Sequence, residues 1–102
     1  MLEEYRRGVR TWMNNYRRYV GEFKNDEPHE IGVLTFLNGD IYEGEFQNGD
    51  PQGKGIFKFG HLIYEGEFYD GTFHGKGILT DNIVNKKFNV NCINGKMFFR
   101  EF

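Results

Sequence analysis

Aromatic and charged residues alternate over short stretches of the chain, and this alternation predicts β-strands. In the segment YEGEF at 42–46, the two aromatic residues and the glycine fall on one face of a strand and the two glutamates on the other, because successive strand side chains point to opposite sides. The pattern is typical of a half-buried strand with a solvated, acidic back. The segment GIFKF at 55–59 also alternates, but both of its faces carry apolar residues, so the pattern does not tell which of the two faces is buried.

Turn signals separate the predicted strands at intervals of about 8–12 residues. Asn-Gly or Asp-Gly pairs occupy positions 38–39, 48–49, 70–71 and 94–95, and both residues of such a pair tolerate the positive φ of a tight hairpin turn. The sequence therefore predicts an all-β chain folded as a continuous antiparallel meander of tandem hairpins.

The predicted hairpins recur as three consecutive full repeats, at 19–41, 42–63 and 64–87. Each repeat begins with a copy of the YEGEF motif, and a second glycine follows the motif glycine after eleven residues. One repeat buries too few rings to offset the entropy of ordering its chain, so we expect the repeats to stabilise one another by stacking. We assign a structural role to the recurring glycines, which are Gly21, Gly32, Gly44, Gly55, Gly66 and Gly77.

The motif glycines lie in the middle of strands, where a glycine normally costs about 0.5–1 kcal/mol. Their recurrence at Gly21, Gly44 and Gly66 favours a packing role, in which the missing side chain lets a neighbouring ring lie flat over the backbone. A β-bulge at the same place is the alternative.

Incomplete copies of the repeat flank the three full ones. Residues 8–18 match a second half, with Trp12 in the place of Phe36, and residues 88–102 match a first half. Terminal repeats have a neighbour on one side only, so we expect both segments to be degenerate caps. In the last copy Val90 replaces the motif glycine and Cys92 replaces the aromatic residue.

This pattern resembles the MORN repeat. The resemblance rests on Tyr-Glu-Gly-Glu-Phe, a turn, QGKG or HGKG, an apolar strand and NGD, and it covers residues 19–87 closely and 8–102 more loosely. It implies an elongated, twisted, solenoid-like sheet forming a single domain over residues 1–102, and a scaffolding role that is often near the cytoskeleton, flagella or membrane junctions. The first repeat departs from the pattern, because Glu30 and Ile31 replace a Gly-Lys pair, so we expect its loop to differ in shape.

Composition supports β structure and a reducing compartment. The 102 residues include eleven Phe and six Tyr but no Ala, which makes the chain a poor helix former and a good strand former. The single cysteine, Cys92, allows no intrachain disulfide, and we expect it to be a small buried hydrophobe and not a reactive thiol. No apolar stretch of about 18 residues is present, so we expect a cytoplasmic protein without a membrane-spanning helix. An association with cytoskeleton, flagellum or membrane is implied by the resemblance alone.

Charge is distributed unevenly within a net charge of −2. Residues 19–81 carry four lysines and twelve acids, whereas residues 1–18 and 82–102 each have a net charge of +3. The basic ends are either simply solvated or meet an acidic surface, in a partner or in another copy of the chain.

No group of residues has the pattern of a catalytic site. Glu43 and Glu45 lie about 6–7 Å apart on one strand face, within the range of glycosidase carboxylates. The pair recurs as Glu65 and Glu67 in equivalent surroundings, however, whereas catalysis requires one protonated and one ionised acid. The GKG segments lack the frame of a phosphate-binding loop. We therefore predict a protein without enzymatic activity.

The histidines, His29, His61 and His74, show no metal-ligand spacing. We predict that the protein has no metal site and no cofactor.

Function is predicted on the aromatic face of the sheet. Aromatic side chains are the usual anchors of interfaces, and we expect tyrosine hydroxyls and one rim of the rings to face a concave groove that receives a peptide or helix. The predicted partner-binding residues are Trp12, Tyr19, Phe23, Phe36, Tyr42, Phe46, Phe57, Phe59, Tyr64 and Phe68.

Two further interactions are open. An anionic phospholipid surface, such as one containing phosphoinositide, could bind a basic patch of Arg6, Arg7, Arg10, Arg17 and Arg18. Two copies could pair into a homodimer through the outer strands near 8–13 and 97–101. We expect no nucleic acid as partner, because an aromatic stripe that binds single strands needs a basic groove and the middle of this chain is acidic.

Overall fold

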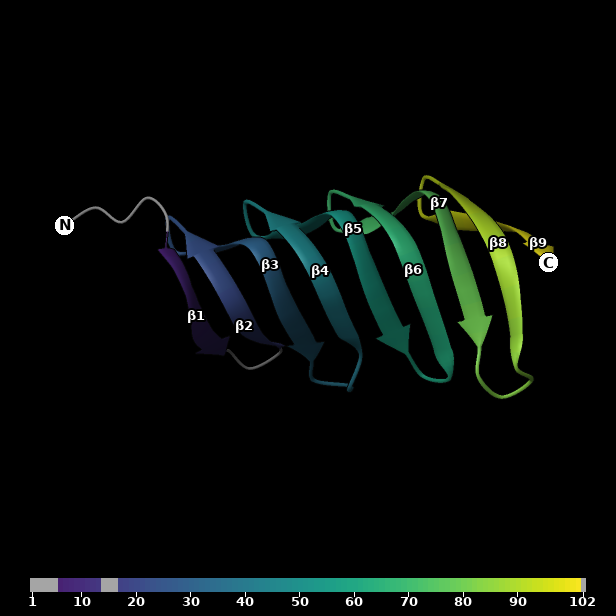
Figure 1. The fold of residues 1–102 in the computed structure, drawn as a ribbon, viewed down its shortest axis with the longest axis horizontal. Coiled ribbons are helices and arrows are strands. Elements are labelled where there is room, and N and C mark those ends of the chain that lie inside the picture. The colour runs from purple at the N-terminus through teal and green to yellow at the C-terminus, as the bar shows by residue number, and fades with distance from the viewer. Residues whose placement is uncertain (1–5, 14–16, 102) are drawn as a thin grey trace.

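A computed structural model describes residues 6–13 and 17–101 and places them in one nine-stranded sheet (Figure 1). The strands follow one another in chain order and every neighbouring pair is antiparallel, so the predicted all-β meander is confirmed. The sheet is elongated, measuring 52 × 23 × 20 Å. Its strands are β1 (Arg6–Met13), β2 (Arg17–Lys24), β3 (Glu27–Phe36), β4 (Ile41–Gln47), β5 (Asp50–Phe59), β6 (Leu62–Tyr69), β7 (Thr72–Asp81), β8 (Lys86–Ile93) and β9 (Lys96–Glu101).

Tight two-residue turns close alternate hairpins along one long edge of the sheet. Asn48 and Gly49 join β4 to β5 with φ of 51° and 92°, and the turns at 70–71 and 94–95 likewise have positive φ at both residues. Two successive positive φ angles match the right-handed twist of a hairpin, so these three predicted turns are confirmed. The first turn uses Asn25 and Asp26, which the search for glycine pairs missed.

Longer or looser connections run along the opposite edge, at 37–40, 60–61 and 82–85 (Figure 1). The predicted turn at 38–39 lies in the first of these, where Gly39 has a φ of 97° and Asn38 does not have a positive φ. The Asn38 side chain accepts a hydrogen bond from the Asp40 backbone N–H at 2.9 Å, which closes the loop instead.

Each hairpin with a tight turn in the three repeats contains a bulge beside its motif glycine. The register shifts so that residues 52–54 lie opposite Glu45 alone, and the other two repeats show the same shift. Gly53 and Gly75 have φ of 91° and 66° in the bulge, and Glu30 has a φ of 66° at the equivalent position. The expectation of a different loop in the first repeat is therefore wrong, because the surrounding hairpin imposes the same backbone on Glu30.

The six recurring glycines form one continuous row across β2–β7. Each is paired in register with the next, from Gly21 through to Gly77. A Cβ atom on Gly44 would lie 2.5 Å from the Cα of Gly55, and a Cβ on Gly55 would overlap the ring of Tyr42. Two explanations were offered for the mid-strand glycines, namely space for a ring and a β-bulge. Both are correct, since a tyrosine packs against the row and a bulge lies beside it.

Tyrosine rings join successive hairpins on the aromatic face, the side of the sheet that carries the core. Tyr42 meets Phe46 of its own hairpin edge-on at 5.1 Å and Phe68 of the next hairpin at 4.8 Å. Tyr19 makes the same two contacts one hairpin earlier. Phe57 also lies on this face, since it pairs with Tyr42. The face of GIFKF that carries Gly55, Phe57 and Phe59 is therefore the one that faces the core. The buried core is Tyr19, Phe23, Leu34, Tyr42, Phe46, Tyr64, Phe68, Leu79, Val90 and Cys92.

The C-terminal segment interrupts the glycine row and the series of tyrosine–phenylalanine contacts. Val90 pairs with Gly77 and so ends the glycine row. The buried Cys92 takes the place of a phenylalanine beside Tyr64, with its sulfur 3.9 Å from the hydroxyl oxygen.

The N-terminal segment is aligned differently from expectation. Trp12 pairs with Tyr19, as Leu34 pairs with Tyr42, so Trp12 corresponds to Leu34 and the match to Phe36 is wrong. The connection between paired strands is one residue shorter here than between β3 and β4, and connection length sets register.

We predict that Gly44→Val strongly destabilises the fold, because the new Cβ would lie 2.5 Å from the Gly55 Cα and 2.6 Å from the Lys54 carbonyl oxygen. Overpacking of this kind costs about 3 kcal/mol, which lowers the melting temperature by more than about 10 °C. Thermal melts followed by circular dichroism measure the change. Glu43→Val, at the exposed neighbouring position, is the control and should melt near wild type. Wild-type melting of Gly44→Val would contradict the packing role of the row.

We predict that Glu30→Gly stabilises the fold by about 0.5–1 kcal/mol. A residue other than glycine with left-handed backbone costs about 1–2 kcal/mol, and the extra freedom of glycine in the unfolded chain returns part of the gain. Urea unfolding measures the difference. Glu27→Gly, at an exposed position of the same strand without positive φ, should instead destabilise. A Glu30→Gly variant less stable than wild type would show that the bulge is unstrained.

Candidate interaction surfaces

Most of the predicted partner-binding rings form the core. Tyr19, Tyr42 and Tyr64 are at most 1% exposed, and Phe23, Phe46 and Phe68 are also buried. The expectation that tyrosine hydroxyls face a groove is wrong. The Tyr42 hydroxyl donates a hydrogen bond to the Glu45 carbonyl oxygen at 2.7 Å, and the other two tyrosines do the same three residues along their own strands. A buried hydroxyl is costly unless it is paired, and these six rings therefore leave little surface for a partner.

Burial also changes the acid–base behaviour of these tyrosines. It raises the pKa of Tyr19 to about 12, and the nearby carboxylate of Glu22 adds to the shift. The pKa values of Tyr42 and Tyr64 are raised in the same direction, again chiefly by burial. The folded state thus holds these protons more tightly than the unfolded chain does. The contribution of the tyrosines to the stability of the fold is therefore fully present below about pH 10, and it is lost as the pH rises through the folded-state pKa.

A smaller group of rings on the aromatic face remains accessible. Phe36, Phe57 and Phe59 are half-buried, and the rings of Phe57 and Phe59 stack with centroids 5.0 Å apart. A pocket of about 160 Å³ opens between Phe36, Phe57 and Phe73. This volume suits one apolar side chain and is below the roughly 300 Å³ of a small-molecule site. Partner binding by Phe36, Phe57 and Phe59 stays a prediction.

The opposite side of the sheet, the polar face, carries a longer groove. The groove encloses about 620 Å³ over β4–β8, and the backbone of the glycine row lines it. The long groove that we expected among the aromatic rings therefore lies on the other face, because the rings fill their own side of the sheet. Its lining side chains are Glu43, Lys54, Ile56, Glu65, Glu67, Lys76, Ile78 and Asn89.

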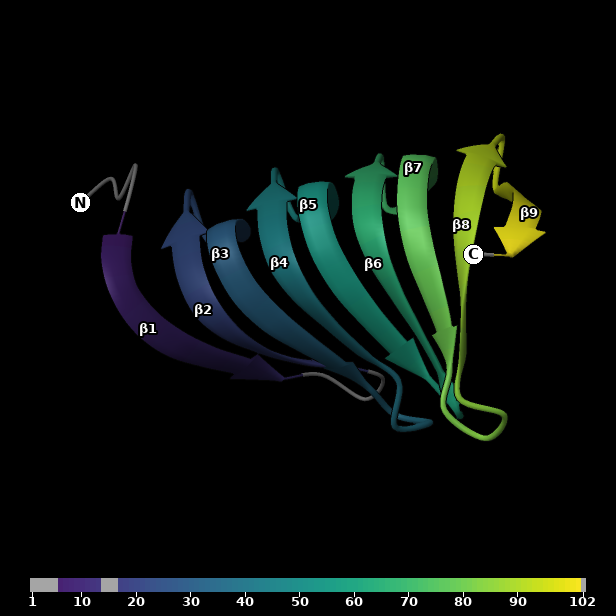
Figure 2. The same cartoon turned by 45° about the vertical axis from the view of Figure 1, so that its right-hand side comes forward.

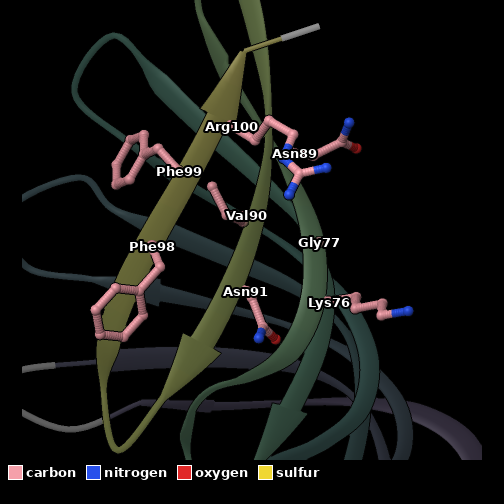
Figure 3. Close-up of a pocket in the computed structure, with 8 residues that line it drawn as sticks. All are labelled: Lys76, Gly77, Asn89, Val90, Asn91, Phe98, Phe99 and Arg100. Atoms are coloured by element: carbon pink, nitrogen blue, oxygen red, sulfur yellow. The ribbon is translucent and has the colours of Figure 1, made fainter.

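The groove continues over the last strands as a second hollow of about 580 Å³, which shares Lys76 and Asn89 with the first. Figure 3 shows the side chains of Lys76, Asn89 and Arg100 projecting to the same side from β7, β8 and β9. Phe98, also on β9, lines this end and is 56% exposed. The lining thus changes from glutamate over β4 and β6 to amide and guanidinium over β8 and β9.

The two glutamates of each YEGEF motif have different surroundings. Glu45 covers the bulge, where one of its carboxylate oxygens accepts a hydrogen bond from the Lys54 backbone N–H at 3.3 Å. A Cβ atom added to Gly75 would touch the Glu67 carboxylate, so the Glu67 side chain covers the next bulge as Glu45 covers its own. Glu43 and Glu65 are exposed in the groove, and neither has an ion-pair partner among the described residues. The two glutamates of one motif therefore differ from each other, whereas the pair as a whole recurs in the next repeat with the same surroundings.

The edge formed by the connections 37–40, 60–61 and 82–85, which we call the loop edge, carries exposed apolar tips. Leu37 is 78% exposed and Ile83 is 72% exposed, and Val84 beside Ile83 is also exposed. Two basic pairs, Arg17-Arg18 and Lys86-Lys87, begin the strands that leave this edge. These connections lie along one long side of the sheet (Figure 1), so the loop edge combines apolar tips with cations.

Loop side chains at one repeated position link neighbouring turns. The His29 ring Nδ1 accepts a hydrogen bond from the Asn48 backbone N–H at 3.5 Å, and the Gln52 side-chain oxygen accepts one from Asp70 at 3.0 Å. The sequence signal for this role is the recurrence of a polar acceptor at this position of each repeat, which metal-ligand spacing does not reveal. Within the described residues no group of three or more His, Cys, Asp or Glu side chains is placed to hold a metal ion.

Several predicted residues fall outside the described side chains. They are Trp12, Arg6, Arg7 and Arg10. Of the predicted lipid-binding arginines, Arg17 and Arg18 are described and are exposed at the start of β2. Burial raises the pKa of the Cys92 thiol, which agrees with the role expected for it.

Comparison with known families agrees with the repeated architecture. The model of the MORN repeat matches residues 19–41, 42–60 and 64–82. The three matches begin where each copy of the YEGEF motif begins. No curated protein matches the chain. The exact repeat boundaries and the two capping half-repeats stay predictions.

Proposed function

The chain belongs to the MORN-repeat family, whose repeats are generally protein- or membrane-interaction modules, and we propose that it binds a peptide or helix of a protein partner along the groove of its polar face. The observation that carries the proposal is the groove itself. Ile56 and Ile78 contribute apolar surface to it, and glutamate and lysine side chains stand around them. Apolar centres with polar surroundings are the usual anatomy of a protein interface.

The polar face suits this role better than the aromatic face does. Most of the described aromatic rings contact one another between hairpins, so the aromatic surface that a partner could reach is small and lies mainly at the pocket beside Phe57 and at Phe99 on β9. Ile78 is 37% exposed in the groove. A rigid sheet that keeps an apolar side chain accessible is pre-organised for binding, which reduces the entropy cost of association.

The MORN repeat is a non-catalytic repeat module, and the proposed role is that of a scaffold. A cytoplasmic location, with an association with cytoskeleton or flagellum, belongs to this proposal. Homodimerisation through β9 is a separate proposal, supported by the exposure of Phe98 and Phe99 on that strand.

We predict that peptides selected from a random library against the wild-type protein lose at least about tenfold in affinity for an Ile56→Asp plus Ile78→Asp variant. Burying a charge against the apolar part of a bound peptide is unfavourable, and two such charges act together. Fluorescence anisotropy measures the affinities.

The matched control is Ile83→Asp plus Ile93→Asp, which makes the same change at exposed isoleucines that do not line the groove. This variant should bind the selected peptides as wild type does. Selected peptides that bind the two double variants equally well would refute the groove as the binding site.

A second candidate function is contact with an anionic phospholipid surface, and the loop edge is the observation that favours it. Its apolar tips at Leu37 and Ile83 could enter the headgroup region while the basic pairs beside them meet lipid phosphates. Arg17 and Arg18 of the predicted basic segment lie at this edge. In the described residues no helix is long and apolar enough to cross a bilayer.

We predict that vesicles containing phosphatidylserine, with or without phosphoinositide, co-sediment with the protein at low salt and release it at high salt, because screening weakens surface electrostatics. Leu37→Asp plus Ile83→Asp should reduce co-sedimentation several-fold. The Ile56→Asp plus Ile78→Asp variant adds the same charge away from the edge and should retain it. Absence of co-sedimentation at low salt would end this candidate.

A further inference from the structure

We infer that the occupant of the groove is an α-helix with one mixed seam, in which cationic residues alternate with apolar residues at heptad spacing. This inference rests on the proposed function and names the chemistry of the partner. It is drawn from the register of the polar face, which places glutamate and isoleucine alternately across successive strands.

One row of side chains runs along the groove, perpendicular to the strands. Register pairs Glu43 with Ile56, Ile56 with Glu65, and Glu65 with Ile78, so the row crosses β4, β5, β6 and β7 in that order. Neighbouring strands lie about 4.8 Å apart, which puts successive members of the row at about that spacing. From Glu43 to Ile78 the row therefore covers about 14 Å.

A helix lying along the row would match this spacing. Residues i, i+3, i+7 and i+10 share one face of a helix, and at a rise of 1.5 Å per residue they span about 15 Å. Such a helix places residue i over Glu43, i+3 over Ile56, i+7 over Glu65 and i+10 over Ile78. An extended peptide does not match, because its same-side residues are about 6.6 Å apart and fall out of step with the strands.

The side chains of the row determine which type of residue is favoured at each facing position of the helix. Glu43 and Glu65 have no ion-pair partner among the described residues and share their row with isoleucines, so they favour cations at i and i+7. Of the two neighbouring rows, the one that lines the groove contains both signs, because Lys54 pairs in register with Glu67, and it adds no net preference. Isoleucine at the other two places favours leucine or a similar apolar side chain at i+3 and i+10.

The far end of the row gives the helix a direction. The row continues from Ile78 to Asn89 and then to Arg100 on β9. The C-terminal end of a helix carries partial negative charge and is stabilised by a nearby cation. The helix therefore runs with its C-terminus toward Arg100, and about 16 residues suffice to cover the row from β4 to β9.

The test uses three synthetic helical peptides of about 18 residues: one with lysine and leucine at the seam positions, one with glutamate and leucine there, and one with the first composition scrambled. Anisotropy titrations at low salt measure their affinities for the full chain. We expect the lysine peptide to bind wild type at least about tenfold more tightly than the other two. Glu43→Lys plus Glu65→Lys should reverse the preference, weakening the lysine peptide and strengthening the glutamate peptide.

The control variant is Glu27→Lys plus Asp50→Lys, which makes the same charge change at exposed positions outside the groove. It should bind the lysine peptide as wild type does, and circular dichroism confirms that all variants are folded. Equal affinity of the lysine and scrambled peptides, or no reversal in the groove variant, would overturn the seam. Library peptides that depend on Ile56 and Ile78 but lack the seam would also overturn it while leaving the proposed function intact. Failure of both library and designed peptides to depend on groove residues would refute the proposed function itself.

Discussion

The fold depends on the contact between a tyrosine ring and a glycine backbone. Tyr42 occupies the space where a side chain on Gly55 would lie, and from there its hydroxyl reaches the Glu45 carbonyl oxygen while its ring meets the phenylalanines of two hairpins. A single-layer sheet has no second layer to cover its apolar side, so its rings must lie flat and cover one another. The glycine row is what makes this possible, because a side chain at any of its positions would point to the face that the rings occupy.

The consequence for function is a division of labour between the two faces. Most of the aromatic residues, which usually anchor interfaces, here join hairpins, and the face that the sequence predicts to be solvated also carries accessible apolar side chains. Glu43 and Glu45 are only two residues apart. Glu45 covers the bulge and stabilises the hairpin, whereas Glu43 lines the groove and remains accessible to a partner.

Local patterns in the sequence were enough to predict the strands, the meander and three of the tight turns, because these depend on neighbouring residues. The turn at Asn25 and Asp26 was missed because asparagine and aspartate signal positive φ more weakly than glycine does. The bulge at Glu30 was misjudged because tertiary context can hold a residue in a backbone conformation that it disfavours. The location of the groove could not be predicted, since alternation separates two faces without telling which one the rings will fill completely.

The hairpin-to-hairpin contact also determines how such an array can change in length. Tyr19 and Tyr42 each use one ring from their own hairpin and one from the following hairpin, so an inserted hairpin of this kind brings a complete joint with it. An inserted single strand would reverse the direction of everything after it and move tight turns to the opposite edge. The array can therefore grow or shrink by duplication or deletion of whole pairs of strands, and each such step lengthens or shortens the groove by about 10 Å.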